Sequence, residues 1–131
     1  MPVTHSLPVQ VYYEDTDFTG VVYHANYLKY FERAREHLLG VEALVKLYQE
    51  RGVGFVVYKA ELTYREGAVH GDLLEVRTTA NAPSEYRAMF NQSIWRGGKG
   101  PLVEGLITLC CVDPQRRLVP LPEEVYAALK G

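Results

Sequence analysis

The order of the helical and strand patterns is the feature that most constrains the fold of this chain. From Asn26 to Leu39, apolar residues recur at spacings of three and four, as on one face of an amphipathic helix. Gly40 suits the end of that helix, and residues 41–49 could form a shorter second helix. Four strand patterns then follow in succession, over residues 56–65, 72–80, 85–95 and 101–113. Because short connections favour antiparallel neighbours, we predict an α+β domain with one long helix lying along a curled antiparallel sheet.

The remaining segments complete this arrangement. Residues 8–13 read as a first strand, so the sheet is expected to have about five strands, and residues 123–129 read as a short C-terminal helix. Turn-forming clusters separate the later strands, at residues 67–71, 81–84 and 97–100. Apolar residues fall on both faces of several strands, which indicates that another subunit covers an edge or an outer face. The expected unit is one domain over residues 1–131.

Charge and hydropathy exclude several classes of partner. The 14 Lys and Arg residues against 16 Asp and Glu residues give a net charge of −2, which offers no general attraction for nucleic acid. No apolar run approaches the ~20 residues of a membrane-spanning helix, and the first 13 residues lack a signal-peptide pattern. Cys110 and Cys111 are adjacent and would point to opposite faces of a strand, so neither a mutual disulfide nor a metal pair is expected. We therefore expect a cytoplasmic protein.

The segment most informative about function covers residues 11–35, between the first strand and the helix. Backbone N–H groups at a helix start are unpaired and carry partial positive charge, so they can stabilise an oxyanion developing on a carbonyl. Asp17 lies shortly before this helix, and Gly20 would let a substrate approach the backbone. A carboxylate beside oriented amides supplies two of the parts that acyl transfer requires.

Structural roles for the same residues remain open on spacing alone. Asp15 and Asp17 could be turn and capping residues, and His24 could be a hydrogen-bonded residue at the helix start. The spacing of these three residues matches no established metal motif, and the chain contains no nucleophile elbow, phosphate-binding loop or dinucleotide fingerprint. The spacing of these residues therefore does not identify the reaction that the protein catalyses.

The same segment resembles the signature of a known family. It reads YYEDTDFTGVVYHANYLKYFERARE, and the later ELTYREGAVHGDLLEV extends the similarity over nearly the whole chain. Both are similar to the 4-hydroxybenzoyl-CoA thioesterase-like family, in particular to its branch of bacterial acyl-CoA thioesterases associated with the Tol–Pal system. The resemblance implies a hotdog fold, a homodimer or a homotetramer formed as a dimer of dimers, and hydrolysis of acyl-CoA without metal or cofactor.

The resemblance also implies roles for three residues. Asp17 takes the position of the catalytic carboxylate, as nucleophile or general base, and Tyr13 that of a nearby hydrogen-bonding aromatic residue. His24 takes the position of the signature histidine, whose backbone N–H polarises the thioester carbonyl. One departure concerns CoA binding, because the hairpin over residues 82–87 contains a single basic residue, Arg87, so no CoA-binding residue is assigned.

Two rival functions remain in view. A hotdog hydratase or dehydratase would place an acid and base pair on the central helix, whereas His24 precedes the helix here. A non-catalytic acyl-binding or scaffold protein would not need Asp17 and His24 together.

Overall fold

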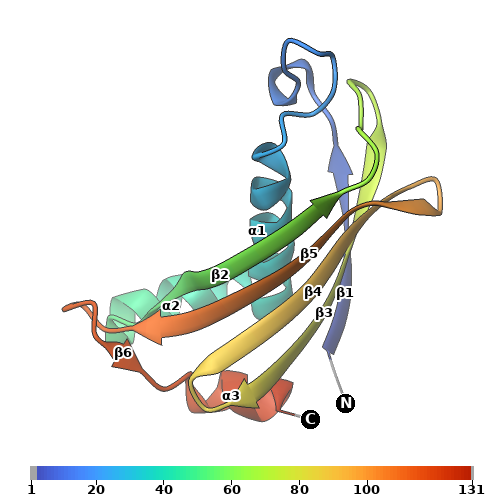
Figure 1. Cartoon of the computed structure of the whole chain (residues 1–131). Helices are drawn as coiled ribbons and strands as arrows, with labels where there is room; N and C mark the ends of the chain where they lie inside the picture. The colour runs from blue at the N-terminus through green and yellow to red at the C-terminus, as the bar shows by residue number, and fades with distance from the viewer. Residues whose placement is uncertain (1–2, 131) are drawn as a thin grey trace.

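The computed structural model describes residues 3–130 and contains one antiparallel sheet that curves around a long helix (Figure 1). The sheet order is β1-β3-β4-β5-β2, and a short β6 pairs with the end of β5. The strands are β1 (Val3–Gln10), β2 (Gly54–Tyr64), β3 (Leu73–Ser84), β4 (Arg87–Arg96), β5 (Lys99–Val112) and β6 (Leu118–Val119). The helices are the 3₁₀ turn η1 (Tyr13–Asp15), α1 (Asn26–Leu39), α2 (Val41–Arg51) and α3 (Glu123–Leu129). This is the hotdog arrangement predicted from the sequence.

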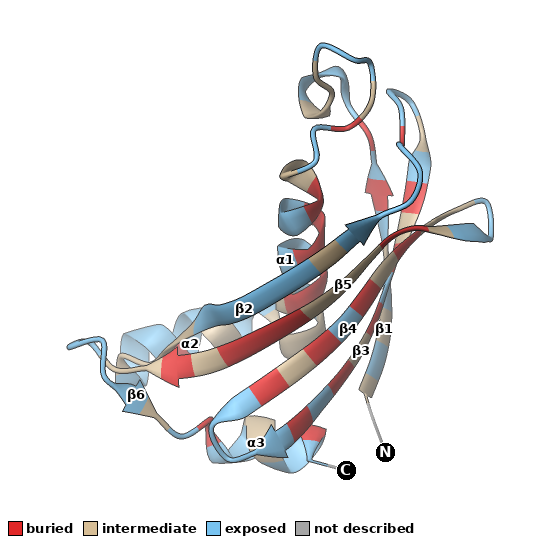
Figure 2. Cartoon of the chain, in the orientation of Figure 1, coloured by how far each residue is buried: buried red, intermediate tan, exposed pale blue. Residues whose placement is uncertain are grey.

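The core lies between α1 and the inner face of the sheet. The helix buries one side (Figure 2). On that side, Tyr27, Tyr30, Phe31 and Ala34 are at most 2% exposed. Even-numbered residues of β3 and β4 form the opposing surface, since alternate residues of a strand share a face. Gly105 of β5 lets the Phe31 ring approach closely, because a Cβ at position 105 would lie 2.7 Å from Phe31 Cε2. The aromatic side of α1 thus fixes the helix on the sheet.

The predicted bounds of two segments were wrong. The first strand was expected over residues 8–13, but β1 covers Val3–Gln10. It ends at Gln10 because the Tyr12 N–H bonds Asp15 Oδ2 at 2.8 Å and the chain turns into η1. A turn was expected over residues 81–84, but β3 continues through them to Ser84 with a register irregularity in its pairing with β4. That irregularity accommodates Pro83, which has no N–H to contribute to the ladder.

The edge strand β2 is the most exposed strand of the sheet (Figure 2). A register shift between Val57 and Lys59 interrupts the regular alternation of a strand, so Val57 and Ala60 lie on the same inner face, opposite Leu109 and Ile107. Within residues 3–130, β2 pairs with β5 alone, so its other edge has no hydrogen-bonding partner.

The two adjacent cysteines and the helices bear on the expectations drawn from composition. Cys110 is partly exposed, whereas Cys111 is buried on the opposite face, and both are free thiols. None of the helices within residues 3–130 combines the length and the apolar character needed to cross a membrane.

Candidate active site

Asp17 lies on the turn that leads from η1 to α1, at one end of the molecule (Figure 1). Backbone hydrogen bonds shape this turn: the Asp17 N–H donates to Val21 O at 2.9 Å, and the Gly20 N–H donates to Asp17 O at 3.0 Å. Gly20 has φ +87°, a left-handed conformation that a residue with a Cβ seldom adopts. The carboxylate opens onto a surface hollow of about 520 Å³, whose walls are Tyr13, Thr16, Asp17, Phe18, Gly20 and His70.

Thr19 holds the carboxylate of Asp17 in place. Its hydroxyl donates to Asp17 Oδ1 at 2.6 Å, and its backbone N–H donates to the same oxygen at 2.8 Å. These two bonds, the hydroxyl first, hold the pKa of Asp17 below its ordinary value, and the electrostatic influence of nearby His24 lowers it further. Asp17 is therefore ionised at neutral pH, as a nucleophile or general base must be.

Asp15 organises the turn from within. Its Oδ2 accepts the Tyr12 N–H, and its Oδ1 accepts Asn26 Nδ2 at 3.0 Å. Its backbone carbonyl also accepts the Tyr23 N–H at 2.9 Å. Asp15 thus ties η1 to the first residue of α1, so the structural role considered for both aspartates applies to Asp15.

The start of α1 carries backbone donors without protein partners. The cap residue Ala25 makes no side-chain capping bond, and within residues 3–130 the N–H groups of His24 and Ala25 have no backbone acceptor. The His24 carbonyl accepts the Tyr64 hydroxyl at 3.1 Å, and its imidazole lies beside the rings of Tyr23 and Tyr64, with centroids at 4.7 and 6.0 Å. The end of β2 is thereby fastened to the start of the helix.

The structure brings the three predicted residues to the same end of the molecule but not into one cluster. Tyr13 and Asp17 line the same hollow, whereas the His24 ring turns towards Tyr23 and Tyr64. The Tyr13 side chain is 79% exposed and makes no side-chain hydrogen bond within residues 3–130; its ring meets His70 edge-on with centroids 5.8 Å apart.

Sequence reasoning missed three residues of this region. A threonine two positions after an aspartate is a common turn pairing, so Thr19 could have been found from the sequence. His70 and Tyr64 come from distant segments, and no local signal placed them here. In the part of the chain that the structure describes, no group of three or more His, Cys, Asp or Glu side chains could hold a metal ion.

Fold and site together define a hotdog protein with an ionised carboxylate, Asp17, on the turn that leads into its central helix. Residues 11–129 match the family model described as the thioesterase-like superfamily, and the chain belongs to this superfamily.

Relatives with known names are similar over most of their length. The chain is 38% identical to the acyl-CoA thioester hydrolase YbgC of Escherichia coli O6:H1 (strain CFT073), over 94% of this chain and 93% of the relative. It is 39% identical to the acyl-CoA thioesterase YbgC of Haemophilus influenzae, over 94% and 92%. Among solved structures, the 1,4-dihydroxy-2-naphthoyl-CoA thioesterase Slr0204 of Synechocystis superposes with a TM-score of 0.87 at 27% identity, covering 97% of this chain and 96% of that structure.

Proposed function

We propose that this protein is an acyl-CoA thioesterase that hydrolyses an acyl-CoA to the free acid and CoA, with Asp17 as its central catalytic residue. The observation that carries the proposal is the ionised carboxylate of Asp17, oriented by Thr19 on an open turn before a helix start with unpaired N–H groups. The names of the YbgC relatives support the same reaction class.

The chemistry makes modest demands on the site. As a general base, Asp17 takes a proton from water while the water oxygen attacks the thioester carbonyl carbon; as a nucleophile, its own oxygen attacks and water later hydrolyses the mixed anhydride. In both routes the carbonyl oxygen becomes an oxyanion that the N–H of His24 stabilises. The carbon–sulfur bond then breaks and CoA leaves as a thiolate, for which no strong acid is needed because thiols have a pKa of about 8.5.

The side chains of His24 and Tyr13 would assist this step without a covalent role. The proximity of His24 lowers the pKa of Asp17, so its imidazole favours the ionised form. Tyr13 is exposed and lines the same hollow, so its hydroxyl can hydrogen-bond to bound water or substrate.

We also propose that the protein works as a homodimer joined through β2. This strand is 11 residues long, contains no proline, and leaves Val56, Val57 and Tyr58 between 40% and 58% exposed. An unpaired strand edge is a template for pairing with a second chain. The same proposal includes a homotetramer and membership of the Tol–Pal-associated branch. It also includes a cytoplasmic location, because the two free thiols suit a reducing compartment.

The proposal is tested by release of free thiol from a panel of acyl-CoAs that runs from short aliphatic to aromatic and long-chain groups. The Asp17→Asn variant should lose about 10²-fold or more of kcat, because the amide keeps the shape of the carboxylate but cannot act as base or nucleophile.

Glu14→Gln is a matched control, since Glu14 is an exposed carboxylate of the neighbouring turn that does not line the hollow. Near-normal turnover of Asp17→Asn would remove Asp17 from the mechanism, and absence of thiol release from every acyl-CoA would refute the proposed function.

A further inference from the structure

Tyr64, the last residue of β2, is bonded to the backbone at the start of α1. Its hydroxyl donates to the His24 carbonyl at 3.1 Å. Its ring lies beside the His24 imidazole, with centroids 6.0 Å apart, and beside the Tyr27 ring, with centroids 5.9 Å apart. The side chain of Tyr64 is therefore held against the helix start, and its hydroxyl reaches the peptide group that joins His24 to Ala25.

This helix start leaves two successive N–H groups free. Within residues 3–130, the N–H groups of His24 and Ala25 have no backbone acceptor, whereas the Asn26 N–H donates to the Tyr23 carbonyl at 2.8 Å. Successive N–H groups at the start of a helix point towards the same end of the helix axis. The two free donors can therefore approach one oxygen atom of a bound molecule.

The peptide groups that carry these two donors both have a hydrogen-bonded carbonyl. The His24 N–H shares its peptide group with the Tyr23 carbonyl, and the Ala25 N–H shares its peptide group with the His24 carbonyl, which accepts the Tyr64 hydroxyl. A bond to the carbonyl polarises the peptide group and makes its N–H a stronger donor. Because the peptide group is planar, the same bond also fixes the direction of the N–H. Tyr64 thus acts on the strength and on the direction of the Ala25 donor.

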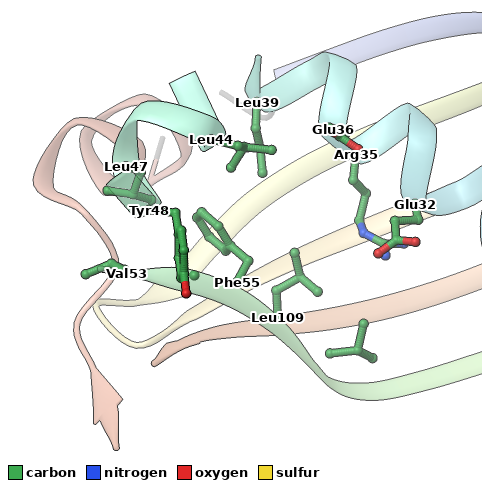
Figure 3. Close-up of a pocket in the computed structure, with 12 residues that line it drawn as sticks. Glu32, Arg35, Glu36, Leu39, Leu44, Leu47, Tyr48, Val53, Phe55 and Leu109 are labelled. Carbon is green, nitrogen blue, oxygen red and sulfur yellow. The ribbon is translucent and has the colours of Figure 1, made fainter. Parts of the chain in front are cut away.

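The strand β2 supports the Tyr64 side chain from a fixed backbone. Tyr64 pairs with Val103 of β5, a fully buried residue. Near the other end of β2, Phe55 lines a cavity of about 220 Å³ together with Leu47 of α2 (Figure 3), and this cavity shares no wall residue with the hollow at Asp17. Groups on regular elements are placed more precisely than groups on loops. The position of the Tyr64 hydroxyl is therefore well defined.

A second tyrosine hydroxyl fastens a neighbouring loop and does not bond to these peptide groups. The Tyr27 hydroxyl accepts the Ala68 N–H at 3.1 Å, and the Val22 N–H donates to the Ala68 carbonyl at 2.8 Å. Both bonds join the segment between β2 and β3 to the chain around the helix start. Tyr27 therefore provides a comparison for a hydroxyl with a purely structural role in the same region.

We propose that Tyr64 is a positioning residue for the reaction, and that its hydroxyl makes the Ala25 N–H a second oxyanion donor beside the N–H of His24. This inference rests on the proposed thioesterase function. Tyr64 acts on the reacting carbonyl only through the peptide group between His24 and Ala25. Without the hydroxyl, the Ala25 N–H is a weaker and less well oriented donor, whereas the bonds between Thr19 and Asp17 remain.

The kinetic test removes the hydroxyl and keeps the ring. Outright deletion of an oxyanion donor costs about 10²–10³-fold in kcat, so Tyr64→Phe, which only weakens one, should lower kcat about tenfold. KM should change by no more than about twofold, and the acidic limb of the pH profile should stay in place, because Thr19 still bonds Asp17. Tyr126→Phe is the matched control, since α3 lies at the far end of the sheet from the helix start (Figure 1).

Two CoA analogues separate a role at the oxyanion from a role in the fold. The hydrate of S-trifluoroacetonyl-CoA resembles the tetrahedral intermediate, whereas S-propyl-CoA has the same chain length and no carbonyl. Tyr64→Phe should weaken binding of the ketone about tenfold and leave the affinity for S-propyl-CoA unchanged, because the donor acts only on the oxyanion. Tyr27→Phe should lower the midpoint of heat unfolding without changing the ratio of the two affinities, since it loses only the bond to Ala68.

The outcomes distinguish this inference from the proposed function. If the unmodified protein hydrolyses acyl-CoA but Tyr64→Phe keeps kcat within about twofold, Tyr64 does not position an oxyanion donor. An equal loss of affinity for both analogues would also overturn the inference, because it would assign Tyr64 to the fold alone. If the unmodified protein hydrolyses no acyl-CoA, the thioesterase proposal fails, and the role of Tyr64 fails with it.

Discussion

Asp17 and Thr19 form a pair in which one residue fixes the charge state of the other. The Thr19 hydroxyl, at 2.6 Å from Asp17 Oδ1, is the main cause of the lowered pKa of this carboxyl. A lowered pKa means that the ionised form persists to lower pH, so activity that needs the carboxylate is lost only in more acidic solution.

Replacement of Thr19 by valine should therefore move the acidic limb of activity. Thr19→Val keeps the branched shape and the backbone N–H but removes the hydroxyl, so the pKa of Asp17 rises and activity begins to fall at a higher pH. The pH profile of kcat/KM measures this shift, with Thr19→Ser as the variant that retains the hydroxyl. Identical acidic limbs for the valine variant and the unmodified protein would show that Thr19 does not control the carboxyl.

Local spacing in the sequence predicted the positions of some side chains and not of others. Tyr13 and Asp17 are four residues apart in one turn, so the sequence alone brings them together. Arg35 follows Phe31 by four positions, so it lies on the buried side of α1. Arginine is seldom buried, so its residue type alone would favour the surface. His70 reaches the hollow only because the segment between β2 and β3 folds back to Tyr13, which no local pattern indicates.

The contact of α1 with β5 depends on the absence of a side chain at Gly105. Gly105→Ala would bring a methyl group to 2.7 Å from Phe31 Cε2, and Phe31 is fully buried, so either the ring or the helix must shift. We expect a loss of about 1–3 kcal/mol in the free energy of unfolding, measured by urea denaturation. Gly54→Ala is the control, because a Cβ there meets no atom within 4 Å; equal losses in both variants would contradict the close contact.

The elements themselves were predicted where periodicity and terminal residues agree. The helix α1 was predicted with its bounds, since an amphipathic repeat ends at Gly40, which adopts φ +101°. The shift in β2 and the extension of β3 through Pro83 were not predicted, because both depend on the register against neighbouring strands and not on local propensity. The two-residue strand β6 was too short to give any pattern.

The proposed dimer through the β2 edge predicts that a charged substitution on this strand prevents the association of two copies. Ala60→Lys puts a charge on the exposed inner face of β2, where pairing of two copies would bury it, so the variant should sediment as a monomer and lose thioesterase activity. Ala127→Lys, an exposed alanine on α3, should leave both properties unchanged. A monomeric unmodified protein with full activity would contradict the dimer.

Association of two copies through the open edge of β2 would make the stability of the fold depend on protein concentration. If pairing of this edge covers backbone groups and apolar side chains that one copy leaves in water, association stabilises the native state, and dilution withdraws that stabilisation. The midpoint of heat unfolding should then climb as the total concentration of protein is raised, which calorimetry over a hundredfold concentration series would reveal. A constant midpoint would mean that each chain carries its full stability alone.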